Sequence, residues 1–285
     1  MKQRIIANPP IGIYTNPTTH IGHAFFLVLL DTIARYKSKF KGEEVIFPGR
    51  SYNFYGKKGD SLLESIGYGE NSHSFLYEKN MESVLSDRSR ERLNLCSIDI
   101  LIDDDPIISE GVKKDFLELY SKRKIKRFGD TFSLKWKDII QSVNVPGILE
   151  GINFHPKRTR MELERILTEN ASLIAISKKT KYSLPNPSGG ENIGPLFVLA
   201  NLWDSKYPNS NYTIAGSNDV LAKYVALRIL SRIALRGNPG MDELIIWPKL
   251  VPEGGVSNWN LDYLTKDKHH ADMLRHSLIK CYCEK

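Results

Sequence analysis

His20 and His23 stand three residues apart at the start of a long apolar stretch, and this spacing puts both side chains on one face of a helix. The Pro- and Thr-rich residues before them, 14–19, are typical of a turn that leads into a helix. The first turn of a helix has unpaired backbone N–H groups and the positive end of the dipole, so it favours phosphate. Gly22 has no side chain, so a flat base or ribose can lie against the backbone there. These residues predict an ATP site, although a histidine at a helix start is more often a cap or a surface group.

The elements around the two histidines predict a parallel sheet. A short apolar strand at 4–7, a helix at about 20–40 and a buried strand at 44–47 follow one another closely along the chain. Strand, helix and strand in this order form a βαβ unit with a right-handed crossover. Ligands of such sheets bind beyond the carboxyl ends of the strands, and His20 and His23 lie at that edge. From about residue 50 to 170 no second unit of this kind is evident.

Composition sets the broad class of the protein. With 285 residues, 41% hydrophobic and 26% charged, the chain is long enough for one globular domain carrying an insertion. Its net charge of +7 suits an anionic partner such as ATP or RNA, although excess charge also serves solubility. Three cysteines exclude a disulfide framework and favour a reducing compartment. The longest apolar run, residues 24–30, is too short to cross a bilayer, so we expect a cytoplasmic protein without a membrane partner.

Three blocks of residues around the histidines stand in register with a known family. They are Tyr14-x-Asn16-x-x-x-His20-Ile-Gly-His23-Ala24, then Asp31-x-Ile33-Ala34-Arg35-Tyr36-Lys37, then Gly42-x-x-Val45-x-Phe47-Pro48-Gly49. Together they resemble the class I aminoacyl-tRNA synthetases, in the methionyl, leucyl, isoleucyl and valyl branch, with the methionyl enzymes closest. The resemblance implies a Rossmann-like α/β fold with a parallel sheet and an α-rich insertion.

Weaker matches continue the resemblance in order along the chain. They include Asp105-Pro106, Phe116-Leu-x-Leu119-Tyr120, Ile176-Ser177-Lys178 and Ala271-Asp272-x-Leu274-Arg275. The implied organisation is a first half of the catalytic domain at 1–60, a connective α-rich insertion at 61–170 and a second half at 171–285. Residues 129–155 contain no cysteine, so the zinc knuckle of the methionyl branch is not expected. No anticodon-binding domain is expected, because the sequence stops where a synthetase would begin one.

The resemblance also assigns roles to individual residues around ATP and the substrate. The implied catalytic residues are His20, His23, Ser257 and Asn258. The implied ATP-binding residues are Asn16, Gly22, Gly216, Asn218 and Asp219, and the substrate-binding residues are Tyr14, Arg50, Asn53, Ser177, Lys178 and Asn201. Asp219 could instead cap the helix that follows it, and Asn218 is an equally good partner for the ribose hydroxyls.

Two stretches depart from the family pattern. After Gly49 the family has an acid that meets the substrate ammonium, whereas this chain has Arg50, Lys57 and Lys58 nearby and no acid. Such a loop suits an anion, unless its charges are simply solvated. The second departure is the Lys-Met-Ser-Lys-Ser signature, whose best counterpart is Gly255-Val-Ser257-Asn258-Trp259. The serine is kept there, and both lysines are absent.

The function implied is ATP-dependent activation of an amino acid or related carboxylate, with Mg²⁺ and without zinc. The acceptor would be the acceptor end of tRNA or a small molecule or protein, rather than a tRNA read by its anticodon. The first alternative is a paralogue that binds nucleotide and has lost catalysis. The second is a nucleotidyltransferase with a similar His-x-Gly-His turn, but those enzymes are shorter and the matches after residue 100 argue against it.

Overall fold

The computed structural model describes most of the chain outside the segment 53–99. It describes residues 3–7, 21–46, 50–52, 100–102, 105–169, 173–179, 184–218, 221–247, 272–273 and 276–277. None of the helices in these ranges is long and apolar enough to cross a membrane.

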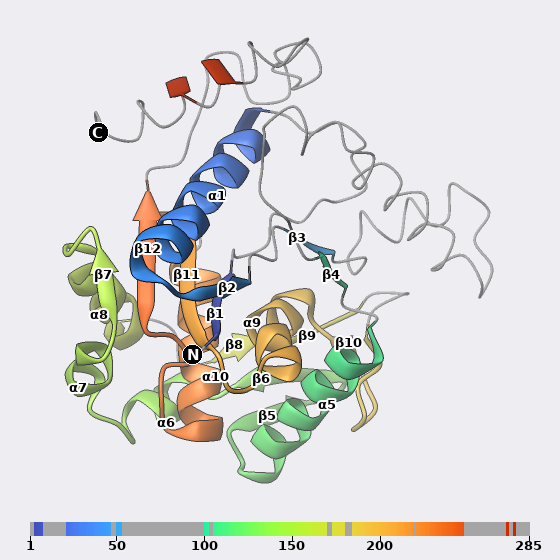
Figure 1. Cartoon of the computed structure of the whole chain (residues 1–285). Helices are drawn as coiled ribbons and strands as arrows, with labels where there is room; N and C mark the ends of the chain where they lie inside the picture. The colour runs from blue at the N-terminus through green and yellow to red at the C-terminus, as the bar shows by residue number, and fades with distance from the viewer. Residues whose placement is uncertain are drawn as a thin grey trace.

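A five-stranded parallel sheet forms the centre of the molecule, with strand order β2-β1-β11-β12-β7 (Figure 1). Its strands are β1 (Gln3–Ala7), β2 (Glu44–Ile46), β7 (Asn153–His155), β11 (Asn211–Ser217) and β12 (Glu243–Trp247). Most of β11 is buried, as expected for a strand covered on both faces. The predicted α/β fold with a parallel sheet is confirmed.

Helix α1 (Ile21–Lys41) connects β1 to β2, which confirms the βαβ unit predicted from the sequence. Its buried side chains include Val28, Leu29, Leu30 and Ala34, so one stripe of the helix covers the sheet. The start of α1 lies on the side of the sheet toward which the strand arrows point (Figure 1). The helix therefore begins at the edge where a parallel sheet binds ligands.

At the opposite, amino-terminal edge of the sheet a buried cluster of charges ties α1 to three strands. The hydroxyl of Thr213 donates to Glu243 at 2.6 Å and accepts from Arg4 at 3.0 Å. The Lys37 ammonium on α1 lies 2.9 Å from the same glutamate. Hydrogen bonds from Thr213 and Lys37 lower the pKa of Glu243 despite its burial, which favours the ionised carboxylate. These groups satisfy one another, which gives this edge of the sheet a structural role.

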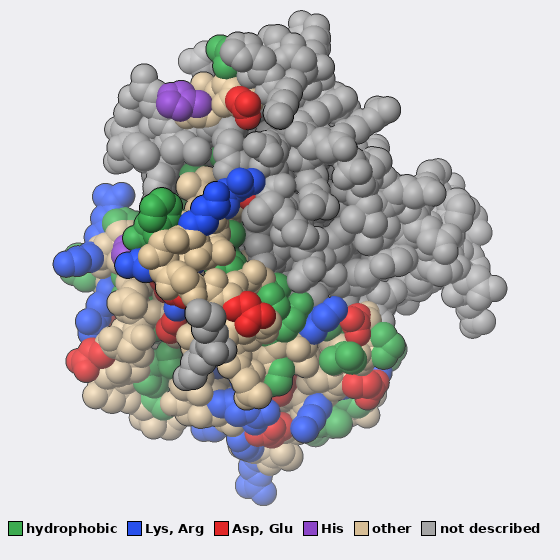
Figure 2. Space-filling view, viewed as in Figure 1, with side chains coloured by type: hydrophobic (Ala, Val, Ile, Leu, Met, Phe, Trp, Pro, Cys, Tyr) green, Lys and Arg blue, Asp and Glu red, His purple; other side chains and the backbone are tan. Residues whose placement is uncertain are grey.

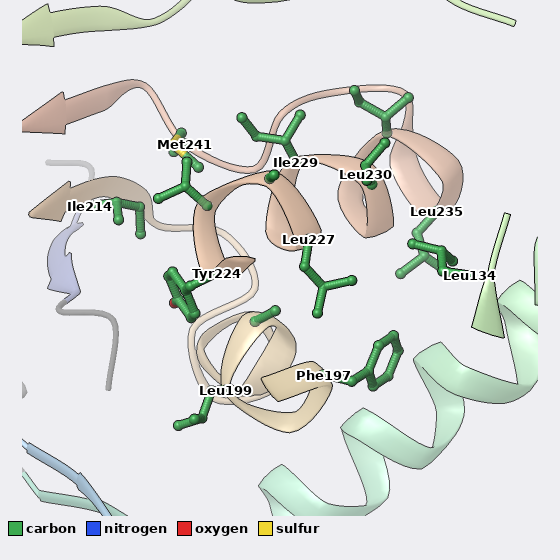
Figure 3. Packing of buried hydrophobic residues seen from close by; sticks show 14 of the residues in the cluster. Leu134, Phe197, Leu199, Ile214, Tyr224, Leu227, Ile229, Leu230, Leu235 and Met241 are labelled. Atoms are coloured by element: carbon green, nitrogen blue, oxygen red, sulfur yellow. The ribbon is translucent and has the colours of Figure 1, made fainter. Parts of the chain in front are cut away.

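Helices α5, α9 and α10 pack against one another and carry much of the core. Their bounds are α5 (Pro106–Ser121), α9 (Pro195–Lys206) and α10 (Ala226–Arg236), the last preceded by one π-helical turn, η2 (Leu221–Val225). Helix α5 contains the family match at Phe116–Tyr120, and η2 with α10 forms the helix expected after Asp219. Figure 3 shows Leu227 of α10 directed toward α9 and Phe197 of α9 turned toward α5.

Smaller elements complete the described structure. The helices are α6 (Trp136–Ile140), α7 (Val145–Glu150) and α8 (Thr159–Glu169). The strands β5 (Ile125–Phe128), β6 (Thr131–Leu134) and β8 (Ile174–Ala175) form an antiparallel sheet. Two further pairs are β9 (Ser177–Lys178) with β10 (Asn192–Ile193), and β3 (Arg50–Tyr52) with β4 (Ile100–Ile102).

Strand β7 is the element that the sequence did not lead us to expect. It lies within the segment 61–170 and yet forms an edge of the main sheet, where Phe154 is in register with Leu244 of β12. Only Phe154 of its three residues is buried, and an alternation over three residues is too short to recognise as a strand. The division of the chain at residue 170 stays a proposal, with β7 and α8 contributing to the sheet region.

Replacing Gly190 with alanine is expected to lower the free energy of unfolding by about 2 kcal/mol or more. Gly190 has φ +81°, and an added Cβ would lie 2.7 Å from the carbonyl oxygen of Asp130 in the β5–β6 turn. Urea denaturation measures the loss. Gly189→Ala is the matched control, since Gly189 has φ +71° with nothing within 4 Å of the added carbon. Equal losses in the two variants would show that the contact with the β5–β6 turn contributes nothing.

Candidate functional site

The first turn of α1 provides the phosphate-favouring helix start that the sequence predicted. Ile21, Gly22 and His23 occupy the first three positions of the helix, so their N–H groups have no partner within it. No acidic residue stands in this first turn, so no side chain of the turn itself offsets the positive end of the dipole. The structure therefore places Gly22 and His23 in the first turn of α1, and their assignment to the ATP site stays a prediction from the sequence.

Strand β11 brings Gly216 and Asn218 to the same edge of the sheet. Gly216 is in register with Ile246 of β12, and Ser217 with Trp247, the last residue of that strand. Ser217 is buried, whereas Asn218 directly after the strand is exposed. Gly216, near the end of β11, and Asn218, just past it, thus lie at the carboxyl edge of the parallel sheet, where ligands bind in folds of this kind.

Several predicted site residues lie outside the described ranges. They are Tyr14, Asn16, His20, Asn53, Asp219, Ser257 and Asn258. Arg50 begins β3, which pairs with β4 apart from the main sheet (Figure 1). The assignments of these residues therefore stay predictions from the sequence.

Ser177 holds three segments together. The backbone N–H of Phe132 donates to its hydroxyl at 2.7 Å, and the hydroxyl donates to Glu191 at 2.9 Å. These bonds join β6, β9 and the segment before β10, and the serine is only 8% exposed. Lys178 is exposed and is paired through the backbone with Asn192 of β10. In the described structure Ser177 has the contacts of a structural residue.

Asn201 is fully buried in the middle of α9. Its amide nitrogen donates to the carbonyl of Phe197 at 2.9 Å, and its Oδ1 atom has no hydrogen-bond partner among the described residues. An unsatisfied buried acceptor costs about 1–3 kcal/mol, so the position is unusual for a purely structural side chain. Asn201 keeps its assignment as a predicted substrate residue.

Arg228 is the centre of a buried ion-pair network that fixes α10 against α9. Its guanidinium, which is fully buried, donates to Asp204 at 2.7 Å and to the backbone carbonyls of Ala200 and Gly240 at 2.8 and 2.6 Å. The same group lies 4.7 Å from the ring centroid of Tyr212 on β11. Because α10 follows the Gly216–Asn218 turn through η2, this network holds the helix behind the candidate ribose site.

The network continues to α5 through two more arginines. Arg232 lies 3.3 Å from Asp115, and Arg236 lies 2.7 Å from Glu118. Burial raises the pKa of Asp115 to about 6, although both arginines oppose this shift. Hydrogen bonds from Arg236 and Lys122 lower the pKa of Glu118 to about 2. The pair of Arg232 with Asp115 is buried and that of Arg236 with Glu118 is partly exposed, and their mutual pairing gives these groups a structural role rather than a catalytic one.

Two sets of residues were missed by the reading of the sequence. Arg228 and Arg232 sit within the apolar stripe of α10, and an arginine inside such a stripe is the signal that a buried carboxylate faces it. The second set is the basic run at 122–127, whose only uncharged member is Ile125. A charge run of this kind is usually solvated, but it also marks surfaces that bind anions. No group of three or more His, Cys, Asp or Glu side chains in the described part of the chain could hold a metal ion.

Comparison with known proteins supports the fold. No protein-family model and no curated protein matches the chain. Two solved structures of Mycobacterium tuberculosis methionyl-tRNA synthetase, one bound by methionyl-adenylate and one in complex with it, match with TM-scores of 0.70 and 0.72 at 14% and 15% identity. Each match covers 98% of this chain, which spans 64% of the length of the synthetase chain. The chain therefore has the fold of these class I synthetases, as the resemblance implied.

Proposed function

We propose that the chain binds ATP and activates an amino acid or a related carboxylate as its adenylate. The observation that carries the proposal is the likeness of the fold, over nearly the whole chain, to a synthetase solved with methionyl-adenylate. The start of α1 and the end of β11 support it, because both lie at the carboxyl edge of the sheet. In such a site ATP would place its phosphates at α1 and its ribose near Gly216 and Asn218.

For this reaction the protein would position the substrates and stabilise the phosphate charge, without forming a covalent intermediate. The substrate carboxylate would attack the α-phosphorus of ATP, the bond from that phosphorus to the bridging oxygen would break, and pyrophosphate would leave. His20, His23 and the N–H groups of the first turn of α1 would hold the phosphates. Gly22 would let the adenosine approach the backbone. Asn218 or Asp219 would accept hydrogen bonds from the ribose hydroxyls.

The proposal also covers the kind of substrate and the kind of acceptor. The loop after Gly49 has Arg50 in place of an acid, which favours a substrate whose α-ammonium is absent or paired elsewhere. The acceptor would be the acceptor end of tRNA, a small molecule or a protein, and a cytoplasmic location fits the three cysteines. The domain division at 1–60, 61–170 and 171–285 belongs to the same proposal.

A second candidate is a nucleotide-binding paralogue without adenylation activity. It is favoured by Asn258, which stands where the family has a signature lysine. Exchange of labelled pyrophosphate into ATP, measured with a panel of carboxylic acids, separates the two. Exchange with any acid supports the enzyme, and ATP binding without exchange across the panel supports the paralogue.

ATP affinity is expected to fall at least tenfold when His20 and His23 are both replaced by alanine, because two donors to the phosphates are removed. Isothermal titration of wild type and double variant measures the change. His276→Ala is the matched control, since that histidine is exposed and outside the proposed site. Unchanged affinity in a double variant that keeps the thermal stability of the wild type would exclude this ATP site.

A further inference from the structure

A basic groove of about 670 Å³ lies beside the β5–β6 hairpin, far along the chain from the proposed ATP site. Five cationic side chains line it, namely Arg123, Lys126, Arg127, Lys135 and Lys137, and Asp138 is the one carboxylate among the lining residues. In Figure 2 lysine and arginine side chains gather along the lower edge of the molecule, where α5 turns into β5 in Figure 1. The groove is open rather than enclosed, so it can accept an extended chain.

Most of these charges are not neutralised within the described structure. Lys135 lies 3.4 Å from Asp138. For Arg123, Lys126 and Lys137 no carboxylate of the described residues lies within 4.0 Å. Lys126 instead lies over the exposed ring of Phe128, 4.6 Å from its centroid. Unpaired cations around a concave surface attract polyanions, because the low-dielectric walls focus the field.

Arg127 and Tyr120 are held in fixed positions at the groove by contacts within the described structure. Arg127 donates to the backbone carbonyls of Gly129 at 2.7 Å and Ser188 at 3.3 Å, while its guanidinium lies 5.2 Å from the ring centroid of Phe132. Carbonyls fix this cation without cancelling its charge, and Asp130 approaches only to 3.9 Å. Tyr120 packs edge-on against Phe132 at 5.8 Å between centroids and stays 37% exposed. A fixed guanidinium and an exposed ring lose little entropy when a ligand binds.

We propose that this groove binds single-stranded nucleic acid. The cations suit the phosphodiester backbone, and the exposed faces of Tyr120 and Arg127 suit unpaired bases, which stack on aromatic rings and guanidinium planes. An acidic protein segment would use the cations but not the ring. The proposal does not rest on adenylation, because the residues that carry it are separate from those assigned to ATP.

The test measures the affinity of a labelled unstructured oligonucleotide of about 10 nucleotides, as RNA and as DNA, by fluorescence anisotropy over a salt series. The variant Arg123→Gln/Lys126→Gln/Lys137→Gln removes three phosphate contacts. Binding at 0.1 M salt is expected to weaken about 10²-fold, and the slope of log K against log salt to fall by about 2. Tyr120→Leu keeps an apolar contact with Phe132 and is expected to weaken binding about tenfold with little change in slope.

The matched control is Lys39→Gln/Lys157→Gln/Arg158→Gln, which removes three exposed cations outside the groove. It is expected to change affinity less than threefold, and an equal loss in control and groove variants would overturn the proposal. Competition gives a second criterion. If inorganic polyphosphate or polyglutamate displaces the oligonucleotide with the same efficiency as unlabelled RNA of equal charge, the proposal is overturned too. Cross-linking of a thiouridine oligonucleotide to the wild type gives an answer that needs no variant. Adducts within 120–138 support the groove, and adducts confined elsewhere contradict it.

Discussion

Replacing Arg228 with methionine is expected to lower the free energy of unfolding by about 3–5 kcal/mol. The variant leaves Asp204 in a site where its side chain is only 9% exposed, with its closest cation removed. It also removes donors to the carbonyls of Ala200 and Gly240. Chemical denaturation of both proteins at neutral pH measures the difference, and Arg165→Met on the exposed face of α8 is the control for a surface arginine.

A double variant shows where the loss comes from. In Arg228→Met the buried carboxylate of Asp204 keeps, among the described residues, only Arg232 at 3.7 Å. If this weakly paired charge dominates the loss, Arg228→Met with Asp204→Asn should be more stable than Arg228→Met alone, because the buried carboxylate is gone. A single variant that loses less than about 1 kcal/mol would contradict the central role of this network.

Replacing Asn258 with lysine is expected to raise the rate of pyrophosphate exchange by about 10²–10³-fold, equivalent to roughly 2.7–4 kcal/mol. The resemblance places the family's signature lysine at this position, where it meets the leaving pyrophosphate. Asparagine can donate only a neutral hydrogen bond, which is weaker than a charge-assisted one. The rate is measured with the best acid of the panel, at saturating ATP.

Lys249 lies shortly before the Gly255–Trp259 stretch in the sequence, outside the described residues, and Lys249→Ala is the companion variant for this experiment. If Asn258→Lys binds ATP and gains no rate, loss of the existing exchange in Lys249→Ala shows that Lys249 already supplies the cation. Absence of exchange in the wild type and in both variants supports the nucleotide-binding paralogue and contradicts adenylation.

Local patterns were enough to predict the first βαβ unit. The apolar strand, the long helix and the second strand are each encoded by neighbouring residues, and β1, α1 and β2 confirm them. Strand β7 could not be found in this way, because it is three residues long and its hydrogen bonds come from β12. The pairing of Arg228 with Asp204, which are 24 residues apart, likewise depends on how two helices pack rather than on either helix alone.

In the candidate site, too, features encoded by neighbouring residues could be predicted, and contacts between distant segments could not. The sequence predicted a helix start near His20 and His23, and α1 begins at Ile21. The contacts of Ser177 could not be predicted, because its partners Phe132 and Glu191 come from two other segments. The charge run at 122–127 was visible in the sequence, but its groove exists only because Tyr120, Lys135 and Lys137 lie beside it in the fold.

The strand order of the main sheet has a consequence for the growing chain on the ribosome. Strand β1 lies between β2 and β11, and Arg4 is bonded to Thr213, 209 residues further along. At translation rates of about 5–20 residues per second, β11 is synthesised roughly 10–40 s after β1, and only then can the two strands pair. During that interval β1 lacks its neighbour β11, although Ile5 and Ile6 of β1 are fully buried in the finished protein. The half-made chain is thus the form most exposed to aggregation, and the form in which a chaperone would change the yield most.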